Sequence, residues 1–433
     1  MRDHDGQAVI SSQLEKEELA ADPSIRAGLR LLRNPNVAKM FVAYVVSYTG
    51  TAMAPIALAF GVLELTGSTK DSAIVIAAPT FAAIAVLLVG GVIADRTSRQ
   101  RVIYISETVS MLAQFAMAWL FVSGTATVPA LAGLMVVHGI VMAFHQPAAV
   151  GFIVQLVETH ELQAANAVLS MARFGAMAGG AALGGVLVAS VGAGYTLAID
   201  AASFGVSALL VFTLTPKLQR PPEAASLLED LKIGWREFTA HTWLWVIVVQ
   251  FSLIVAAMEA VFGLIGPAFA RDQMNGAQDW GLIAGGFGLG TLLGALLGIR
   301  VRPLYPMRFG TYCVFLLSAI PLALLFAAPV WLVALTGVAA GCAGQIFGIL
   351  WYTALQKNIP TEMLSRVSAY DHLGSIGLAP LGIVVAGLLY ETQGAQLTLG
   401  AAAALIVLPT LAVLLVRDVR MMADKEVAAG VSH

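Results

Sequence analysis

Two acidic residues and two histidines lie inside long apolar stretches of the sequence, where ionisable side chains are otherwise rare. Glu259 is near the centre of one stretch, Asp371 lies in another, and His138 and His145 share one helix face at spacing i, i+7. A charge at mid-bilayer costs roughly 2.5–3.5 kcal/mol, burial favours a neutral carboxyl, and histidine exchanges protons near neutral pH. All four are therefore candidates for proton coupling. Structural hydrogen bonds are the alternative for Glu259 and for both histidines.

Polar and aromatic side chains in the same apolar stretches are candidates for the wall of a substrate cavity. Tyr44, Tyr48 and Thr51 fall in the first stretch, and alignment of the two halves of the chain puts Glu259 opposite Thr51 on the face of the tyrosines. There Glu259 would either exchange a proton for substrate or neutralise a cationic substrate. The remaining cavity candidates are Gln114, Gln250 and Gln345.

The elements that carry these residues are predicted to be membrane-spanning helices. The chain of 433 residues is 58% hydrophobic and 12% charged, with a mean hydropathy of +0.83, whereas soluble domains carry about 25% charged residues. About 20 apolar residues span a bilayer as a helix, and the stretches lack the alternation of a membrane barrel. The twelve predicted spans are 37–63, 71–94, 101–123, 128–155, 165–191, 195–214, 243–270, 277–299, 307–328, 330–352, 366–390 and 396–417.

The positions of lysine and arginine predict the orientation in the membrane. With the N-terminus inside, 21 of the 24 basic residues fall in cytoplasmic segments, Lys70 and Arg271 fall outside, and Arg173 lies within a helix. Segments rich in Lys and Arg stay on the cytoplasmic side. We therefore expect a multi-pass protein of the cell membrane, surrounded by the lipid bilayer, with both termini in the cytoplasm.

The chain is predicted to consist of two similar halves. After the fourth and tenth spans the sequence repeats at an offset of 201 residues, with Gln155 matching Gln356 and Glu161 matching Glu362. We expect an all-α polytopic protein of two pseudo-symmetric six-helix bundles, with the substrate site between them. The predicted parts are a cytoplasmic N-terminal segment, the N-terminal bundle, a cytoplasmic linker, the C-terminal bundle and a cytoplasmic tail: 1–36, 37–214, 215–242, 243–417 and 418–433.

A charged turn between the second and third spans points to a family. Its residues are Gly91, Asp95, Arg96, Arg99 and Arg101. They resemble the loop-2/3 signature of the major facilitator superfamily, although Ser98 replaces a usual glycine and Gln100 interrupts the basic run. The resemblance covers residues 36–417 and implies a conformational latch that keeps the inner side closed in the outward-open state. The alternative is that the arginines only anchor the turn on the positive, inner side.

Glycines in two predicted helices favour close helix–helix packing. The fifth span resembles the Gly-Pro-x-x-Gly-Gly motif of superfamily exporters, except that Ala181 replaces the proline. The eighth span has a glycine at every fourth position, and this is a packing face and not a nucleotide-binding loop, because no strand precedes it. The packing glycines are Gly180, Gly184, Gly185, Gly286, Gly290 and Gly294.

Three short segments resemble the branch of the superfamily that contains macrolide pumps and siderophore exporters. They are 144–148 at the end of the fourth span, 165–167 at the start of the fifth, and 200–204 in the sixth. The arginine that is common in the fourth span of proton-coupled exporters would fall on Met135. Any proton relay must therefore be built differently in this chain.

The resemblance implies a secondary active transporter, and we expect a proton-coupled antiporter that exports amphipathic drugs or secondary metabolites by alternating access. Its partners would be a small-molecule substrate and protons. We expect a monomer without cofactor, metal, nucleic acid or enzymatic activity; Cys313 and Cys342 have neither metal nor redox spacing. An importer of a small nutrient, favoured by Ala181 and Met135, is the alternative, whereas a scaffold or receptor would leave the repeat unexplained.

Overall fold

The computed structural model describes residues 30–423, apart from Thr97, 159–160, 217–226 and 299. For residues 87–96, 163, 227–231, 361–362 and 365 it describes the backbone alone. The described part of the chain is helical throughout, without a strand.

Ten helical stretches of the described chain are long and apolar enough to cross a membrane. The helices of the first half are α3 (Pro35–Thr66), α4 (Thr69–Arg96), α5 (Arg99–Val122), α6 (Val128–Phe152) with η1 (Ile153–Gln155), and α7 (Leu162–Phe212). Those of the second half are α9 (Thr242–Ala260) with the π-helix η3 (Val261–Ile265) and α10 (Gly266–Gln273), α11 (Ala277–Gly298), α12 (Pro306–Val314) with η4 (Phe315–Ser318) and α13 (Ala319–Leu325), α14 (Val330–Asn358), α15 (Thr361–Ile376), and α16 (Ala379–Leu415). Between the halves lies α8 (Leu227–Ala240), and α17 (Arg417–Arg420) follows α16.

Two of the ten stretches are pairs of spans joined at a glycine. Ala164–Phe212 and Arg366–Leu415 contain 49 and 50 residues, about twice the 20 or so that one crossing requires. The chain turns within α7 at Gly192 (φ 86°, ψ 169°) and within α16 at Gly394 (φ 81°, ψ 177°), and glycine adopts positive φ without a steric penalty. The ten stretches therefore make twelve spans, which confirms the predicted fold class.

Local sequence sets both ends of the first span. Asn34 Oδ1 accepts a hydrogen bond from the backbone N of Asn36 (3.0 Å), the usual arrangement of an N-cap, and Pro35 occupies the first turn, where no N–H is required. Gly67 follows α3 in the left-handed conformation (φ 68°), and its N–H donates to the carbonyl oxygen of Leu63 (2.9 Å).

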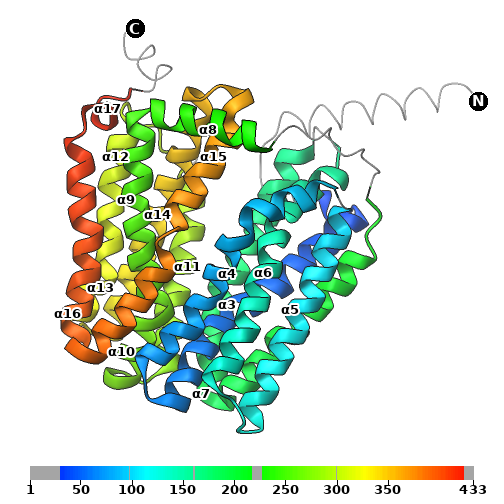
Figure 1. The fold of residues 1–433 in the computed structure, drawn as a ribbon, viewed down its shortest axis with the longest axis vertical. Coiled ribbons are helices and arrows are strands. Elements are labelled where there is room, and N and C mark those ends of the chain that lie inside the picture. The colour runs from blue at the N-terminus through cyan, green and yellow to red at the C-terminus, as the bar shows by residue number, and fades with distance from the viewer. Residues whose placement is uncertain (1–29, 97, 159–160, 217–226, 299, 424–433) are drawn as a thin grey trace, which may run out of the picture.

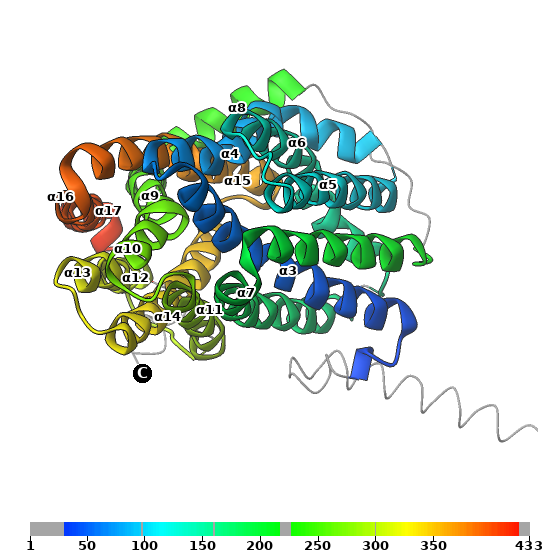
Figure 2. The same cartoon turned by 90° about the horizontal axis from the view of Figure 1, so that it is seen from below.

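The two halves form separate groups of helices that lie side by side (Figure 1, Figure 2). In Figure 1, α8, α15 and α17 lie at the top, and α10 and the bend of α7 lie at the bottom. We call the top the α8 end and the bottom the far end. The two groups of helices meet near the far end and diverge toward the α8 end.

Matching glycines of the two halves make equivalent helix contacts. Gly180 of α7 and Gly382 of α16 lie 202 positions apart, and the glycines at the two bends have the same spacing. A Cβ at Gly180 would overlap the backbone of Thr49 in the first span of its half, and a Cβ at Gly382 would overlap that of Ala256 in the first span of the other half. The predicted pseudo-symmetry is therefore present in the backbone packing, within one position of the expected offset.

Glycines of α11 bring its backbone against that of α14. A Cβ at each of three positions, one on every turn of α11, would overlap a carbonyl oxygen of α14. Such an approach is open only to a residue without a side chain. The facing residues are Gly286 with Ala334, Gly290 with Val338, and Gly294 with Cys342.

Candidate functional site

Hydrogen bonds join the two halves at the far end. Glu391, close to the bend of α16, accepts two of them at Oε2, from Ser68 Oγ (2.9 Å) and from the backbone N of Lys70 (3.0 Å). One turn away, Thr69 Oγ1 donates to the carbonyl oxygen of Gly387 (3.0 Å). The connection between α3 and α4 in the first half is thereby tied to α16 in the second.

Arg271, at the end of α10, makes a further link between the halves. Its Nη1 donates to the carbonyl oxygen of Leu63 in α3 (3.2 Å), and its Nε donates to Asp272 Oδ1 (2.8 Å). Asp272 Oδ2 in turn accepts from the hydroxyl of Tyr390 in α16 (3.1 Å). A small apolar patch from α4, η3 and α16 is also buried between the halves: Ala73, Ala77, Leu264 and Ile383. Together these contacts close the far end.

Small residues of α7 and α11 bring the two halves into backbone contact. A Cβ at Gly185 would overlap the backbone of Ala277 and Gly281, and a Cβ at Gly288 would overlap that of Ala178. Gly185, Ala277 and Gly281 lie toward the far end of the two helices, and Gly288 and Ala178 lie near the middle of their spans. The crossing therefore belongs to the same closed arrangement as the hydrogen bonds of Glu391.

A second face of α7 packs within its own half. A Cβ at Gly180 would overlap the backbone of Thr49, and a Cβ at Gly184 would lie 2.8 Å from Met53 Cα, both in α3. The glycines of α7 thus serve two different contacts, one inside the first half and one between the halves.

We expect Glu391→Ala to open the far end more often. The change removes the acceptor of the bonds from Ser68 and Lys70, which join the halves only while the far end is closed. The open population should rise several-fold, measured as faster thiol labelling of Ala77→Cys, because Ala77 is 1% exposed in the closed arrangement.

The labelling is carried out in a chain whose two natural cysteines have been replaced by alanine. Asp279→Ala is the control, because Asp279 Oδ2 accepts bonds from Asn275 (2.9 and 3.0 Å) within the same half. Labelling of Glu391→Ala at the rate of the control would contradict a gating role for Glu391.

Glu259 lies on the face of α9 that points toward the first half. Gly263, one turn further along that face, would place a Cβ 3.1 Å from Ile76 of α4. Glu259 is exposed, and its carboxylate accepts no hydrogen bond from another described residue. The π-helix Val261–Ile265 begins two residues after it, and single π-turns within helices are frequent at functional sites. The Glu259 carboxylate is thus accessible between the halves, and no hydrogen bond from a described residue holds it against a neighbouring helix.

Tyr44 and Tyr48 of α3 form an aromatic pair beside a cation. Their rings meet edge to face with centroids 5.3 Å apart, and the guanidinium of Arg173 in α7 lies 6.0 Å from the centroid of the Tyr48 ring. An arginine over an aromatic face is attracted by the ring quadrupole. Thr51 and Gln345, predicted for the same cavity, are partly exposed.

A buried polar cluster within the first half joins α5, α6 and α7. Glu107 Oε1 accepts from Ser207 Oγ (2.8 Å) and lies 3.5 Å from His145 Nε2. Nearby, His138 Nδ1 lies 3.2 Å from Ser110 Oγ. Both predicted histidines therefore face polar partners. Glu107, only 3% exposed, is absent from the residues that the sequence singles out.

Asp200 in the second span of α7 is a further buried acid of the first half. It is 0% exposed, and its Oδ1 lies 3.5 Å from Ser203 Oγ. A Cβ at Gly50 of α3 would overlap the Asp200 carboxylate, so the glycine provides the space that this acid occupies. Across the described residues, no three His, Cys, Asp or Glu side chains come together as a metal site.

Three predicted site residues lie in helix packing within one half. Asp371 Oδ2 accepts from Trp351 Nε1 (3.0 Å), and Gln250 Nε2 donates to Thr410 Oγ1 (3.0 Å). Gln114 is 2% exposed in α5. Gln114 and Gln250 are thus enclosed between helices of their own half, and their place in the cavity wall stays a prediction.

The charged turn is described in part. The backbone alone is described for Gly91, Asp95 and Arg96, and their side chains lie outside the described residues, so the latch stays a prediction. Arg99 Nη1 donates to the carbonyl oxygen of Gly151 (2.6 Å) and ties the start of α5 to the end of α6. Arg101, two residues further along, is exposed.

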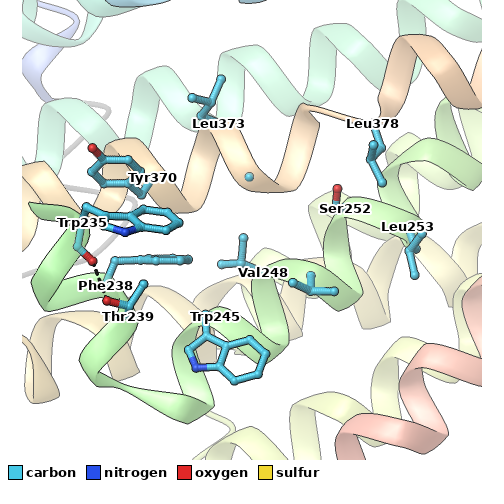
Figure 3. Close-up of a pocket in the computed structure, with 12 residues that line it drawn as sticks. Trp235, Phe238, Thr239, Trp245, Val248, Ser252, Leu253, Tyr370, Leu373 and Leu378 are labelled. Carbon is cyan, nitrogen blue, oxygen red and sulfur yellow. Dashed lines mark hydrogen bonds between the residues drawn. The ribbon is translucent and has the colours of Figure 1, made fainter. Parts of the chain in front are cut away.

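An apolar groove of about 830 Å³ lies in the second half beneath α8 (Figure 3). At one end of it, the Tyr370 ring of α15 lies 5.4 Å from Trp235 and 6.0 Å from Phe238 of α8, between centroids. Val248 and Leu253 of α9 continue the wall. The lining comes from α8 and from helices of the second half, and it contains none of the predicted site residues.

Comparison with known proteins identifies the family. A family model described as "Transmembrane secretion effector" matches residues 27–431. The chain belongs to this family of the major facilitator superfamily. The chain is 26% identical over 377 residues to the enterobactin exporter EntS of Salmonella typhimurium, covering 82% of this chain and 88% of the exporter. It is 25% identical over 373 residues to the EntS protein of Escherichia coli O1:K1, with the same coverage.

Solved structures of transporters share the fold of this chain. The nucleoside transporter NupG superposes with a TM-score of 0.70 at 15% identity, over 88% of this chain and 99% of NupG. A bacterial homologue of the iron transporter ferroportin, in an inward-facing state, superposes with a TM-score of 0.69 at 15% identity, over 89% and 98% of the two chains. The family match and the twelve spans together make the chain a multi-pass membrane transporter.

Proposed function

We propose that this transporter exports amphipathic organic compounds, such as drugs or secondary metabolites, in exchange for protons. The observation that carries the proposal is the family, described as a secretion effector, with enterobactin exporters among the relatives. Ala181 stands where the exporter motif has a proline, but α7 and α11 still pack closely at this position. A Cβ at Gly281 of α11 would lie 3.0 Å from the backbone oxygen of Ala181 in α7. The importer alternative keeps the support of Met135, and the fold shared with the nucleoside transporter NupG at 15% identity does not decide the direction of transport.

The α8 end is the cytoplasmic side in this proposal, because the basic residues concentrate in the segments at that end. The closed far end is then the outer side. The arrangement corresponds to the inward-open state of a transporter whose two halves rock about a site between them. Export from this state begins with substrate binding from the cytoplasm or the inner leaflet.

Glu259 is the residue proposed to exchange a proton for substrate. It combines three properties: it lies in an apolar span, it faces the other half, and it is exposed. Asp371 lacks the last property, because it is buried against Trp351. Proton and substrate would compete for the Glu259 carboxylate, and such competition is what obligatory exchange requires.

We expect Glu259→Gln to abolish proton-driven accumulation while exchange of substrate for substrate persists. Glutamine retains the size and polarity of the side chain but has no proton to release. The assay uses everted vesicles with an acidified lumen and a compound chosen beforehand from a panel of macrolides, catechol siderophores and amphipathic dyes. The unchanged protein should drive the compound into the lumen, and the variant should only equilibrate it.

Asp371→Asn is the matched control, because the amide oxygen still accepts the Trp351 bond; its accumulation should equal that of the unchanged protein. A wild-type pH profile in Glu259→Gln would remove Glu259 from the coupling mechanism. Movement of the compound out of the vesicles together with protons would support the importer instead.

A further inference from the structure

The pair Glu107 and His145 has unused hydrogen-bonding capacity inside the protein. Glu107 Oε1 is engaged by Ser207 Oγ and lies near His145 Nε2. The other polar atoms of the pair, Glu107 Oε2 and His145 Nδ1, are buried and have no hydrogen-bond partner among the described residues. Buried polar groups are normally satisfied. Two unsatisfied atoms on one acid–base pair point to a site that gains and loses a proton.

The surroundings of the pair make its charge depend on that proton. Tyr44 and Tyr48 of α3 interact electrostatically with Glu107, and His138 of α6 interacts with His145. Arg173 of α7 interacts with the same two tyrosines. When Glu107 is ionised and His145 is neutral, the negative charge of Glu107 balances the positive charge of Arg173. One added proton leaves the cluster with an excess positive charge in a medium of low dielectric constant, where charge interactions are strong.

His145 provides the connection from the pair to water. Its side chain is 13% exposed, against 4% for Glu107, whereas Asp200 is 0% exposed and has no comparable route. Glu107 lies eight residues into α5, about 12 Å from the α8 end at about 1.5 Å per residue. The pair is therefore within the membrane but accessible from the open side of the transporter.

We propose that Glu107 and His145 form a second proton-binding site, which adds one proton to the exchange that competition at Glu259 makes obligatory, so that two protons are exchanged for each substrate molecule and neither drives transport in Glu259→Gln. A proton from water binds to the pair on one side of the membrane and returns to water on the other, and no other bond is made or broken. This inference rests on the proposed proton-coupled export.

The number of protons is measured as the accumulation ratio at equilibrium. In vesicles with the membrane potential clamped at zero and a pH difference of one unit, each exchanged proton multiplies the ratio by about ten. The unchanged protein should reach about a hundredfold, and Glu107→Gln and His145→Gln should each reach about tenfold. Glu107→Gln keeps an oxygen acceptor for Ser207, so a purely structural role would leave the ratio unchanged.

Ser207→Ala is the matched control. It removes the hydrogen bond to Glu107 Oε1 and leaves both titratable groups in place, so the ratio should stay at the value of the unchanged protein. A ratio in Glu107→Gln equal to that of the unchanged protein overturns the second site, as does a ratio of only about tenfold in the unchanged protein. Absence of any gradient-driven accumulation in the unchanged protein overturns the proposed export instead. If Glu107→Gln fails to reach the membrane, the accumulation ratio of His145→Gln tests the second site: about tenfold supports it, and the ratio of the unchanged protein overturns it.

Discussion

Transport is expected to be lost in Gly185→Leu although the protein still reaches the membrane. The leucine would overlap the backbone of Ala277 and Gly281 in α11, and this contact forms between the halves only when the far end closes. Overpacking costs about 1–3 kcal/mol, which is roughly a tenfold to hundredfold change in population. The state with a closed far end is then rarely populated. The transport cycle stops in the state in which the far end is open.

Two measurements check this expectation. The rate of compound transport should fall by roughly the same tenfold or more as the population, and labelling of Ala77→Cys should rise. Gly179→Leu on the same helix is the control, because a Cβ there meets nothing within 4 Å. Gly184→Leu should instead reduce the amount of folded protein, since Gly184 packs on Met53 inside its own half. If Gly185→Leu transports like Gly179→Leu, the crossing of α7 and α11 is not part of the gate.

Gly290→Leu is expected to prevent stable folding of the second half. A Cβ alone would overlap the carbonyl oxygen of Val338 in α14, and backbone atoms cannot move aside as a flexible side chain can. We expect a loss of about 3 kcal/mol, at the upper end of overpacking effects. The amount of protein in the membrane should fall several-fold, and the remainder should unfold at a lower temperature in detergent.

Gly348→Leu is the control for this change. Gly348 lies in α14, the partner helix, and a Cβ there meets nothing within 4 Å, so both the amount and the unfolding temperature should be close to those of the unchanged protein. Equal amounts of Gly290→Leu and Gly348→Leu would show that α11 and α14 can separate without loss of the fold.

The sequence by itself determined the class of protein, the number of spans and the repeat. Each of these depends on properties that run along one chain: the length of an apolar stretch, the position of glycine and proline, and the offset between similar segments. The bends at Gly192 and Gly394 are an example, since a helix of twice the bilayer length must turn where positive φ is accessible. The sequence also indicated His145 and Glu259 as unusual residues for an apolar span.

Only the tertiary structure decided which side chains meet. Gly184 and Gly185 are neighbours in sequence, but successive helix positions point about 100° apart, so one contacts α3 and the other contacts α11. Glu107 lies close to the basic start of its span and resembles a solvated residue in the sequence, yet α6 and α7 enclose it. Asp371, an expected coupling residue, is held by Trp351. The burial of a residue and its hydrogen-bond partners depend on the helices packed around it. The sequence of its own helix does not specify which helices these are.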